Sequence, residues 1–544
     1  MDKECGRRFI SPRAHPSSAV SGAWLHQLWV GGADGEFYSS VDKMQDLAQV
    51  EHELLNATRS YLEQQQLKLE IYMSYVEQLK EEHEWAMEQK HLDEYLGHPL
   101  HAFRLIKRLV KDWDALIFLP IITNEPKEEF RQFLEDITHD LGYPDHSELQ
   151  GAVKGLARLQ NVYNLSTSHL ADGDIGGYMY ESVLQWRECY EIGVQLFDLG
   201  DYQRSLEWLQ EAFIILRGNP EKDEQQHARF MSDIREYAAL ANFELGNPIK
   251  AGNLLNRILE YPQKPDHIAQ QSRKYLENKK PAKNLKEKTQ SWSANYTRLC
   301  QGRRVPEEST GNPLKCFLDG KRHAYYTLAP LQVEPVHVDP DINVYHGMLS
   351  SEQILSIFEE ADKLEMVRSA VAGTGGVRSV RDLRVSQQTW LNYTSPVMSS
   401  ISRIIQFISG LDIAGAEFMQ VANYGVGGQY EPHTDYFEFN LPKEYIGDRI
   451  STSMFYLSDV EQGGYTVFPK LNVFLPPIKG AMVMWHNLHR SLDVDVRTLH
   501  AGCPVLVGSK RIGNIWIHSG YQEFRRPCDL TSDSYKSLAY RDWL

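Results

Sequence analysis

The residues with the clearest chemical potential are three His-x-Asp pairs, because a histidine and an aspartate two positions apart lie on the same side of an extended chain. The pairs are His91/Asp93, His337/Asp339 and His433/Asp435. The first lies in a helical run, and the second lies between prolines in a predicted loop. The third follows a strand-like segment and the glycine turn 425–428. Only the third pair has the extended context that would aim both side chains at one ion.

A third ligand for the His433/Asp435 pair must come from elsewhere in the chain. Two histidines and one carboxylate bind Fe(II) on one face and leave the other positions for substrate and oxygen. The later histidines are His486, His489, His500 and His518. Only His500 is followed ten residues later by a cation in a β-rich context, Lys510, which could pair with the carboxylate of a cosubstrate. Each histidine taken singly is more often a surface group, so the joint pattern carries the prediction of a metal site.

Short β-type runs surround these residues from about residue 341 onwards, separated by Gly and Pro turns. The runs are 416–422, 450–457, 481–485, 504–507 and 514–518. Many short strands in one stretch indicate a barrel or a sandwich. The chemistry is therefore expected on a β-rich domain at the back of the chain.

The front of the chain reads as helical. Residues 38–90 carry apolar residues at coiled-coil spacing, which predicts self-association; a helix packed on its own domain is the alternative. Within 183–262, a small residue is followed by Gly at +7 and a small residue at +12. The two copies are Gly193/Gly200/Ser205 and Ala239/Gly246/Ala251. This spacing is typical of tetratricopeptide helix hairpins that bind an extended peptide, although an ordinary helical bundle is the other interpretation.

Composition narrows the class of protein. The 544 residues are 42% hydrophobic and 24% charged, which are globular values, and the net charge of −16 argues against a general nucleic-acid binder. No apolar run reaches the length of a transmembrane helix. Six cysteines and four glycosylation sequons suit an oxidising compartment. The sequons begin at Asn56, Asn164, Asn295 and Asn392.

Several segments resemble the α-subunit family of the collagen prolyl 4-hydroxylases, within the 2-oxoglutarate- and iron-dependent dioxygenases. The catalytic segments are QVANYGVGGQYEPHTD at 420–435, GGYTVFP at 463–469, and HAGCPVLVG at 500–508, continuing to Lys510. Two others are GHPLHAFRLIKRL at 97–109 and GYQEFRRPC at 520–528. The resemblance covers about residues 38–528.

With the composition, the resemblance implies a multidomain chain that is helical first and β-rich second. The expected parts are an N-terminal extension or degenerate signal (1–37), a helical coiled-coil dimerisation region (38–165), a tetratricopeptide-like peptide-binding domain (166–262), a linker (263–340), a catalytic double-stranded β-helix or jelly roll (341–528) and a tail (529–544).

The resemblance also implies a role for individual residues. His433, Asp435 and His500 would bind iron, and Lys510 would pair with the distal carboxylate of 2-oxoglutarate. The 2-oxoglutarate pocket would be lined by Tyr424, Thr466 and Trp516. The peptide would contact Tyr430, Arg449 and His518 near its proline, and Tyr190, Tyr202 and Tyr237 in the helical repeat. Disulfides are implied at Cys300–Cys316 and Cys503–Cys528, with Cys189 unpaired.

The chain departs from the family pattern in two places. Arg511 stands where the family has Trp, and in an extended strand its side chain would face away from Lys510. In the helical repeat, tyrosines are replaced by Phe197, Leu240 and Phe243. Fewer hydroxyls along the repeat predict an altered affinity for proline-rich peptides.

The implied function is that of a procollagen-proline 4-dioxygenase using Fe(II), 2-oxoglutarate and ascorbate. Its expected partner is protein disulfide isomerase, in an α2β2 assembly in the endoplasmic reticulum lumen. The chain carries no Lys-Asp-Glu-Leu signal at its end, so retention is expected through that partner. The alternatives are a dioxygenase for another peptidyl proline or lysine, and a non-catalytic peptide-binding subunit.

Overall fold

The structure is a computed structural model. It describes residues 66, 69–70, 73–81, 83–85, 87, 92–112, 146–221, 223–258, 293–304, 314–364, 367–369, 371–372, 378–379, 384–437 and 447–530. By its internal contacts the chain forms two compact units, Met1–Lys80 and Glu81–Leu544. None of the helices in the described part is long and apolar enough to cross a membrane.

The first unit is helical at its described positions, from residue 66 onwards. Leu69 and Val76, two residues of the predicted coiled-coil seam, expose 45% and 42% of their surface. The earlier seam positions Leu47, Leu54 and Tyr61 lie outside the described residues. An exposed apolar stripe suits the predicted self-association, which remains a prediction.

The second unit begins with short helices. These are α2 (Leu92–Gly97), α3 (Pro99–Lys107), the π-helical turn η2 (Arg108–Asp112), α6 (His146–Tyr163) and α7 (Thr167–Ala171). A small hairpin of β1 (Asp174–Ile175) and β2 (Tyr178–Met179) follows. Residues of α3, α6 and α7 share one buried cluster with the helices that come next, so this segment packs with the helical repeat.

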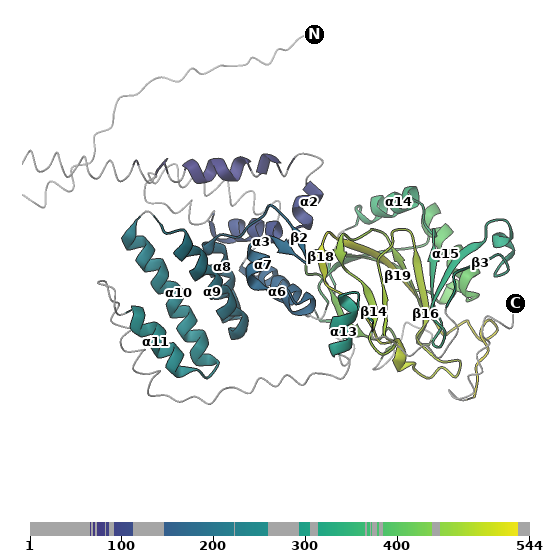
Figure 1. The fold of residues 1–544 in the computed structure, drawn as a ribbon. Helices are drawn as coiled ribbons and strands as arrows, with labels where there is room; N and C mark the ends of the chain where they lie inside the picture. Colours follow the sequence, from purple (N-terminus) through teal and green to yellow (C-terminus); the bar gives the residue numbers. More distant parts are fainter. Residues whose placement is uncertain are drawn as a thin grey trace, which may run out of the picture. The chain divides into compact units, whose positions relative to one another are not determined.

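Two helix hairpins occupy the segment for which a tetratricopeptide-like repeat was predicted (Figure 1). They are α8 (Trp186–Asp198) with α9 (Tyr202–Gly218), and α10 (Glu224–Glu244) with α11 (Pro248–Ile258). The small residues explain the close packing. A Cβ on Gly193 would lie 2.8 Å from Leu209, and the Ser205 hydroxyl donates to the Gly193 carbonyl at 2.7 Å. Gly200 turns the chain between the helices with a φ of +83°, a conformation that glycine adopts without penalty.

The back of the chain folds into two antiparallel sheets in a jelly-roll-like arrangement, as predicted (Figure 1). The larger has the order β3-β4-β5-β16-β12-β19-β10-β9-β6 and the smaller the order β11-β17-β14-β15. The strands of the larger sheet are β3 (Phe317–Asp319), β4 (Leu331–His337), β5 (Ile342–His346), β16 (Met482–His486), β12 (Arg449–Tyr456), β19 (Lys510–His518), β10 (Met419–Tyr424), β9 (Gln387–Leu391) and β6 (Val367–Arg368). The smaller sheet comprises β11 (Tyr430–His433), β17 (His500–Gly502), β14 (Thr466–Phe468) and β15 (Val473–Leu475).

The core lies on both faces of the larger sheet. Helices α14 (Ser351–Ala361) and α15 (Pro396–Ser409) bury their apolar stripes on one face. A second buried cluster joins Tyr424 and Tyr456 of the larger sheet to Phe468 of the smaller one. Two short pairs complete the domain, β13 (Gln462–Gly463) with β18 (Val505–Val507) and β7 (Val371–Ala372) with β8 (Arg378–Ser379), along with the 3-10 turns η3 (Ala324–Thr327), η5 (Ile413–Gly415) and η6 (Val496–Thr498).

The described part of 263–340 differs from the linker expected for it. Helix α13 (Ser293–Cys300) shares a buried cluster with Val467 of β14 and Ala501 of β17. Strands β3 and β4 extend the larger sheet beyond β5 through antiparallel pairing. The linker prediction rested on the polar, Lys-rich stretch 263–295, of which 263–292 lie outside the described residues.

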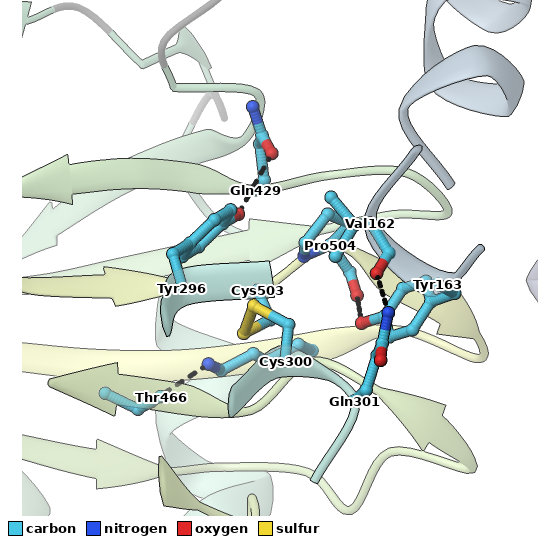
Figure 2. The surroundings of a disulfide bond; sticks show 10 residues. Val162, Tyr163, Tyr296, Cys300, Gln301, Gln429, Thr466, Cys503 and Pro504 are labelled. Carbon is cyan, nitrogen blue, oxygen red and sulfur yellow. Dashed lines mark hydrogen bonds between the residues drawn. A yellow bond between two sulfur atoms is a disulfide. The ribbon is translucent and has the colours of Figure 1, made fainter. Parts of the chain in front are cut away.

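The disulfide pairing implied by the family resemblance is wrong. Cys300 pairs with Cys503, with the two Cα atoms 5.5 Å apart (Figure 2). The end of α13 lies against the segment after β17, so Cys300 and Cys503 are buried in one cluster. Cys316 and Cys528 are exposed and carry free thiols, and Cys189 is free and buried, as expected.

Candidate metal and cosubstrate pocket

Three predicted ligands come together at one edge of the smaller sheet. His433 ends β11, His500 begins β17, and the two residues are direct partners in the antiparallel register. Asp435 follows His433 by two residues. One ligand atom from each of the three side chains lies within 4.8 Å of the others. Among the four histidines that the sequence left open, the cross-strand pairing brings His500 next to His433, which makes His500 the candidate third ligand.

Both histidines are oriented by backbone carbonyls. Nδ1 of His433 lies 2.7 Å from the Glu431 carbonyl, and Nδ1 of His500 lies 3.0 Å from the Thr498 carbonyl. A carbonyl only accepts hydrogen bonds, so the proton of each neutral ring sits on Nδ1. Each Nε2 keeps its lone pair, and the Nε2 atoms lie 3.8 and 3.6 Å from the Asp435 carboxylate.

The electrostatics of the three groups suit metal binding. Burial, and then the neighbouring His500, lower the pKa of His433 to about 3, so its ring is neutral at neutral pH. Burial alone would raise the pKa of Asp435, but the two histidines, Arg449 and a hydrogen bond from Thr452 outweigh it and lower that pKa to about 2. The Thr452 hydroxyl donates to Oδ2 at 2.7 Å and is held in turn by the Asn487 amide. Two imidazoles and one carboxylate form the donor set that fits Fe(II).

Of the other two His-x-Asp pairs, the structure describes His337/Asp339, whose two side chains bind separate groups. His337 bonds the Pro340 carbonyl through Nδ1, while Asp339 accepts from Arg497 at 3.0 Å. His91 lies outside the described residues. Within the described ranges, the group of His433, Asp435 and His500 is the one that meets the geometry of a metal site.

Lys510 lies in the same pocket and is 3% exposed. Its ammonium donates to the Thr466 hydroxyl at 3.2 Å, and that hydroxyl also accepts from Tyr456 (Figure 2 shows Thr466). Burial lowers the pKa of Lys510 to about 7. Among the described residues no carboxylate pairs with it, so the pocket contains a buried cation that would be stabilised by an anionic ligand.

The pocket has a volume of about 470 Å³, including the space at its opening. Four of the predicted contact residues line it: Tyr424, Thr466, Trp516 and Tyr430. The indole N–H groups of Trp485 and Trp516 are buried and find no acceptor within the described ranges. A ligand with several oxygens would supply acceptors for them.

Other lining residues were not anticipated. They are Thr452, Met454, Trp485, Ala501, Gly502, Cys503, Ile512 and Asn514. Strand alternation could have found some of them, because Thr452 and Met454 share one face of β12, and Ile512, Asn514 and Trp516 share one face of β19 with Lys510.

Arg449 and His518 lie beside the pocket and do not line it. The Arg449 guanidinium donates to both carboxylate oxygens of Glu417, at 2.5 and 2.9 Å. Nε2 of His518 lies 2.9 Å from the same carboxylate. Arg449 also donates to the Asp435 carbonyl at 3.3 Å, so this buried network touches the backbone of a proposed metal ligand.

Arg511 points away from the pocket, as the strand alternation predicted. Its guanidinium lies 4.8 Å from the ring centre of Phe358, on the helix α14 that covers the outer face of the sheet. The second cation therefore does not share the environment of Lys510.

The three predicted tyrosines of the helical repeat lie on α8, α9 and α10, apart from the pocket-lining set. The rings of Tyr190 and Tyr237 are 5.9 Å apart. Phe197 lies 5.3 Å from Tyr202 and 5.7 Å from Tyr237, so a phenylalanine completes the aromatic row. We call these four residues the aromatic face.

Two family models match the chain. The N-terminal region of the prolyl 4-hydroxylase alpha-subunit matches residues 40–177, and the 2OG-Fe(II) oxygenase superfamily matches residues 419–518. The second range contains every residue proposed to contact metal or cosubstrate.

Full-length relatives match over nearly the whole chain. Prolyl 4-hydroxylase subunit alpha-1 of Bos taurus is 33% identical over 527 residues, which cover 91% of this chain and 96% of that protein. Subunit alpha-3 of Homo sapiens is 31% identical, with 92% and 95% covered. Among solved structures, a viral collagen prolyl hydroxylase of Paramecium bursaria Chlorella virus-1, in its 2OG complex, is 26% identical with a TM-score of 0.27; it covers 32% of this chain and 94% of that one.

Proposed function

This chain belongs to the family of prolyl 4-hydroxylase α subunits, and from that premise we propose that it hydroxylates C4 of peptidyl proline in procollagen-like chains. The enzyme is a 2-oxoglutarate- and Fe(II)-dependent dioxygenase. When bound, the iron and 2-oxoglutarate supply the oxidising chemistry, converting O2 and 2-oxoglutarate to succinate and CO2 as the proline is hydroxylated. The protein binds, orients and shields the reactants.

His433, Asp435 and His500 would hold the iron. The observation that supports this role is the pair of bonds from Nδ1 to backbone carbonyls, which presents both Nε2 lone pairs toward the Asp435 carboxylate. Such outer bonds fix the tautomer and orientation of a metal-binding histidine. The hydrogen bond from Thr452 likewise orients the Asp435 carboxylate.

Lys510 would bind the distal carboxylate of 2-oxoglutarate, with Tyr424, Thr466 and Trp516 lining the pocket around it. The single observation that carries this proposal is the buried ammonium, whose hydrogen-bond partner among the described residues is the neutral Thr466 hydroxyl. A buried charge is stable when it is paired, and a dicarboxylate would provide the missing anion. The indole N–H of Trp516 is a further donor available to it.

The peptide would contact the chain in two regions. Tyr430, Arg449 and His518 are proposed to act near the reacting proline, and Tyr430 lines the pocket itself. The two helix hairpins are proposed as a tetratricopeptide-like peptide-binding domain, with Tyr190, Tyr202 and Tyr237 on its aromatic face. A row of neighbouring aromatic rings suits proline-rich segments, because these adopt a preformed polyproline helix.

The assembly and the compartment are also proposals. The exposed Leu69 and Val76 support self-association through the first unit, and the partner would be a protein disulfide isomerase β subunit in an α2β2 tetramer. A buried disulfide supports an oxidising compartment such as the endoplasmic reticulum lumen. Ascorbate would keep the iron reduced. Of the sequons, Asn164 and Asn392 are exposed, whereas the Asn295 amide donates to the Pro469 carbonyl.

One experiment tests this function and its alternatives. The chain, coexpressed with a disulfide isomerase, is supplied with Fe(II), 2-oxoglutarate, ascorbate and a panel of Pro-Pro-Gly, other proline-containing and lysine-containing peptides. Succinate release and a mass gain of one oxygen on proline of the Pro-Pro-Gly peptide are expected. Turnover on another peptide alone would support a different substrate, which the loss of tyrosines at Phe197, Leu240 and Phe243 would explain. Peptide binding without succinate would support a non-catalytic subunit.

A further inference from the structure

We propose that the helical part of the second unit forms the outer wall of the 2-oxoglutarate pocket, with Tyr163 and Gly97 as positioning residues for Lys510. The inference rests on the proposed contact between Lys510 and 2-oxoglutarate. It assigns a catalytic-domain function to two residues more than 300 positions earlier in the chain, in segments that bind neither metal nor cosubstrate.

Tyr163, the last residue of α6, makes the first contact. Its hydroxyl donates to the Pro504 carbonyl at 2.5 Å, and the Gly464 amide donates to the same carbonyl at 3.0 Å (Figure 2 shows Tyr163 and Pro504). Gly464 packs directly on the lysine, since a Cβ built on it would lie 3.6 Å from Cδ of Lys510. Tyr163 therefore fixes the Pro504 carbonyl, and this carbonyl fixes the Gly464 backbone against the Lys510 side chain.

The atoms at this contact are closely packed. A Cβ on Gly463 would lie 2.6 Å from the Tyr163 hydroxyl and 2.8 Å from the Pro504 carbonyl. Gly463 itself has a φ of +78°, so its backbone conformation also favours glycine. A small movement of Tyr163 would thus be transmitted to the loop of Gly463 and Gly464.

Gly97, the last residue of α2, makes the second contact, with Gly508. Its carbonyl accepts a hydrogen bond from the Gly508 amide at 2.9 Å. The approach is backbone against backbone, because a Cβ on Gly97 would lie only 3.1 Å from Cα of Gly508. Gly508 precedes Lys510 by two residues and has a φ of +94°. The glycine at the start of the 97–109 motif is explained by this close approach.

Buried apolar surface joins the two contacts. Leu506 and Val507 of β18 are 4% and 3% exposed, and they belong to the same buried cluster as Val153 and Leu156 of α6. Arg158 of α6 also donates to the Gly427 carbonyl at 2.6 Å, in the turn between the pocket residues Tyr424 and Tyr430. The outer side of this wall is therefore covered by helix rather than by solvent.

The first test is Tyr163→Phe, which removes the hydroxyl and keeps the ring. The dissociation constant for 2-oxoglutarate is measured by calorimetry on the full chain with its partner, loaded with Mn(II). We expect binding to weaken roughly fivefold, the equivalent of one net hydrogen bond. Hydrogen exchange of the metal-free protein should show faster exchange in the peptide that contains Gly464. Affinity for a Pro-Pro-Gly peptide should not change.

The matched control is Tyr326→Phe. Tyr326 is also a buried tyrosine, 4% exposed, but its hydroxyl has no partner within the described ranges. It packs in the cluster between the larger sheet and helices α14 and α15. This variant should bind 2-oxoglutarate like the parent and leave exchange near Gly464 unaltered.

The second test is Gly97→Ala, which adds one methyl group against the Gly508 backbone. The displaced backbone should weaken 2-oxoglutarate binding in the same direction and to roughly the same extent. Gly151→Ala on α6 is the control, because a Cβ there meets no atom within 4 Å. The two tests act on different backbone groups of one segment, the Pro504 carbonyl and the Gly508 amide.

Lys510→Ala, measured in parallel, separates the inference from its premise. If Lys510→Ala weakens 2-oxoglutarate binding while Tyr163→Phe and Gly97→Ala match the parent, the positioning role is overturned and the cosubstrate contact stands. If Lys510→Ala itself binds 2-oxoglutarate normally, the premise fails and the inference fails with it. Equal weakening by Tyr326→Phe would also overturn the inference, because the effect would then be a general loss of stability.

Discussion

The metal and cosubstrate pocket and the aromatic face of the helical repeat are built on different principles. In the pocket, each proposed polar residue is held by a second group: His433 and His500 by backbone carbonyls, Asp435 by Thr452. On the aromatic face, Tyr190 and Tyr237 are half-buried and meet neighbouring rings at their edges. The pocket therefore depends on a few residues in fixed positions, whereas the face would distribute the proposed peptide binding over several similar rings.

The largest effect is expected at the metal site. Asp435→Ala should abolish succinate release and weaken Fe(II) binding, because it removes the one carboxylate of the proposed donor set. The fold should survive, since a metal site with open positions is rarely the main source of stability in a domain of this size. Turnover, bound iron and thermal unfolding are the measurements. Asp493→Ala, on an exposed loop, is the control and should retain activity; activity retained by Asp435→Ala as well would mean that another acid binds the metal.

The next effect is expected at Lys510. Lys510→Ala should raise the KM for 2-oxoglutarate by roughly a hundredfold or more, corresponding to about 3 kcal/mol for an unpaired buried carboxylate. Fe(II) and peptide binding should change little. Lys510→Arg should recover only part of the loss, because the planar guanidinium needs a different pocket depth. Arg511→Ala is the control and should be mild, since Arg511 packs on Phe358. If Arg511→Ala raised the KM for 2-oxoglutarate and Lys510→Ala did not, the carboxylate-binding role would belong to Arg511.

The pH dependence of cosubstrate binding tests the same cation without mutation. Burial holds the pKa of Lys510 at about 7 in the ligand-free pocket, and a bound carboxylate would raise it. The protonated lysine is thus the form that binds. Affinity for 2-oxoglutarate should be constant below about pH 7 and should fall up to about tenfold per pH unit above it. Calorimetric titrations from pH 6 to 9 measure this, and Lys510→Arg should flatten the profile; a flat profile in the parent would contradict it.

The smallest effect is expected on the aromatic face. Tyr237→Ala removes a ring that contacts both Tyr190 and Phe197. It should raise the KM for a long Pro-Pro-Gly peptide by about fivefold, the equivalent of about 1 kcal/mol for an aromatic contact, and leave kcat unchanged. Tyr178→Ala, an exposed tyrosine outside the face, is the control. A collapse of kcat in Tyr237→Ala would remove the distinction between the two regions.

Local signals in the sequence identified residues that the structure brings together in one pocket. His433 and Asp435 lie two residues apart, and strand alternation places Lys510 inside and Arg511 outside. The strands around them were also found from short apolar runs between turns. The spacing of small residues likewise predicted the two hairpins. The helices pack closely because Gly193 on one faces Ser205, twelve residues later, on the other.

The sequence could not predict contacts between distant segments. The disulfide joins Cys300 to a partner 203 residues away, and nothing near either cysteine signals that α13 packs beside β17. Contacts of α6 with the catalytic strands are of the same kind. The sequence also did not predict that Arg449 and His518 bind one carboxylate, because Glu417, their shared partner, lies on no motif.

The outer edge of the larger sheet has a consequence for how the protein behaves in concentrated solution. The larger sheet has β6 at one edge and β3 at the other. Strand β6 is only two residues long. Exposed apolar side chains lie on β3 and in the segment that follows it. Leu318 on β3 is 69% exposed, and Tyr325 and Leu328 just after it are 66% and 96% exposed. No strand of the described residues pairs with the outer side of β3, and a free strand edge with apolar side chains is a template for pairing with another chain. The isolated protein is therefore expected to aggregate through this edge, and buffers or fusions that shield it should extend its shelf life.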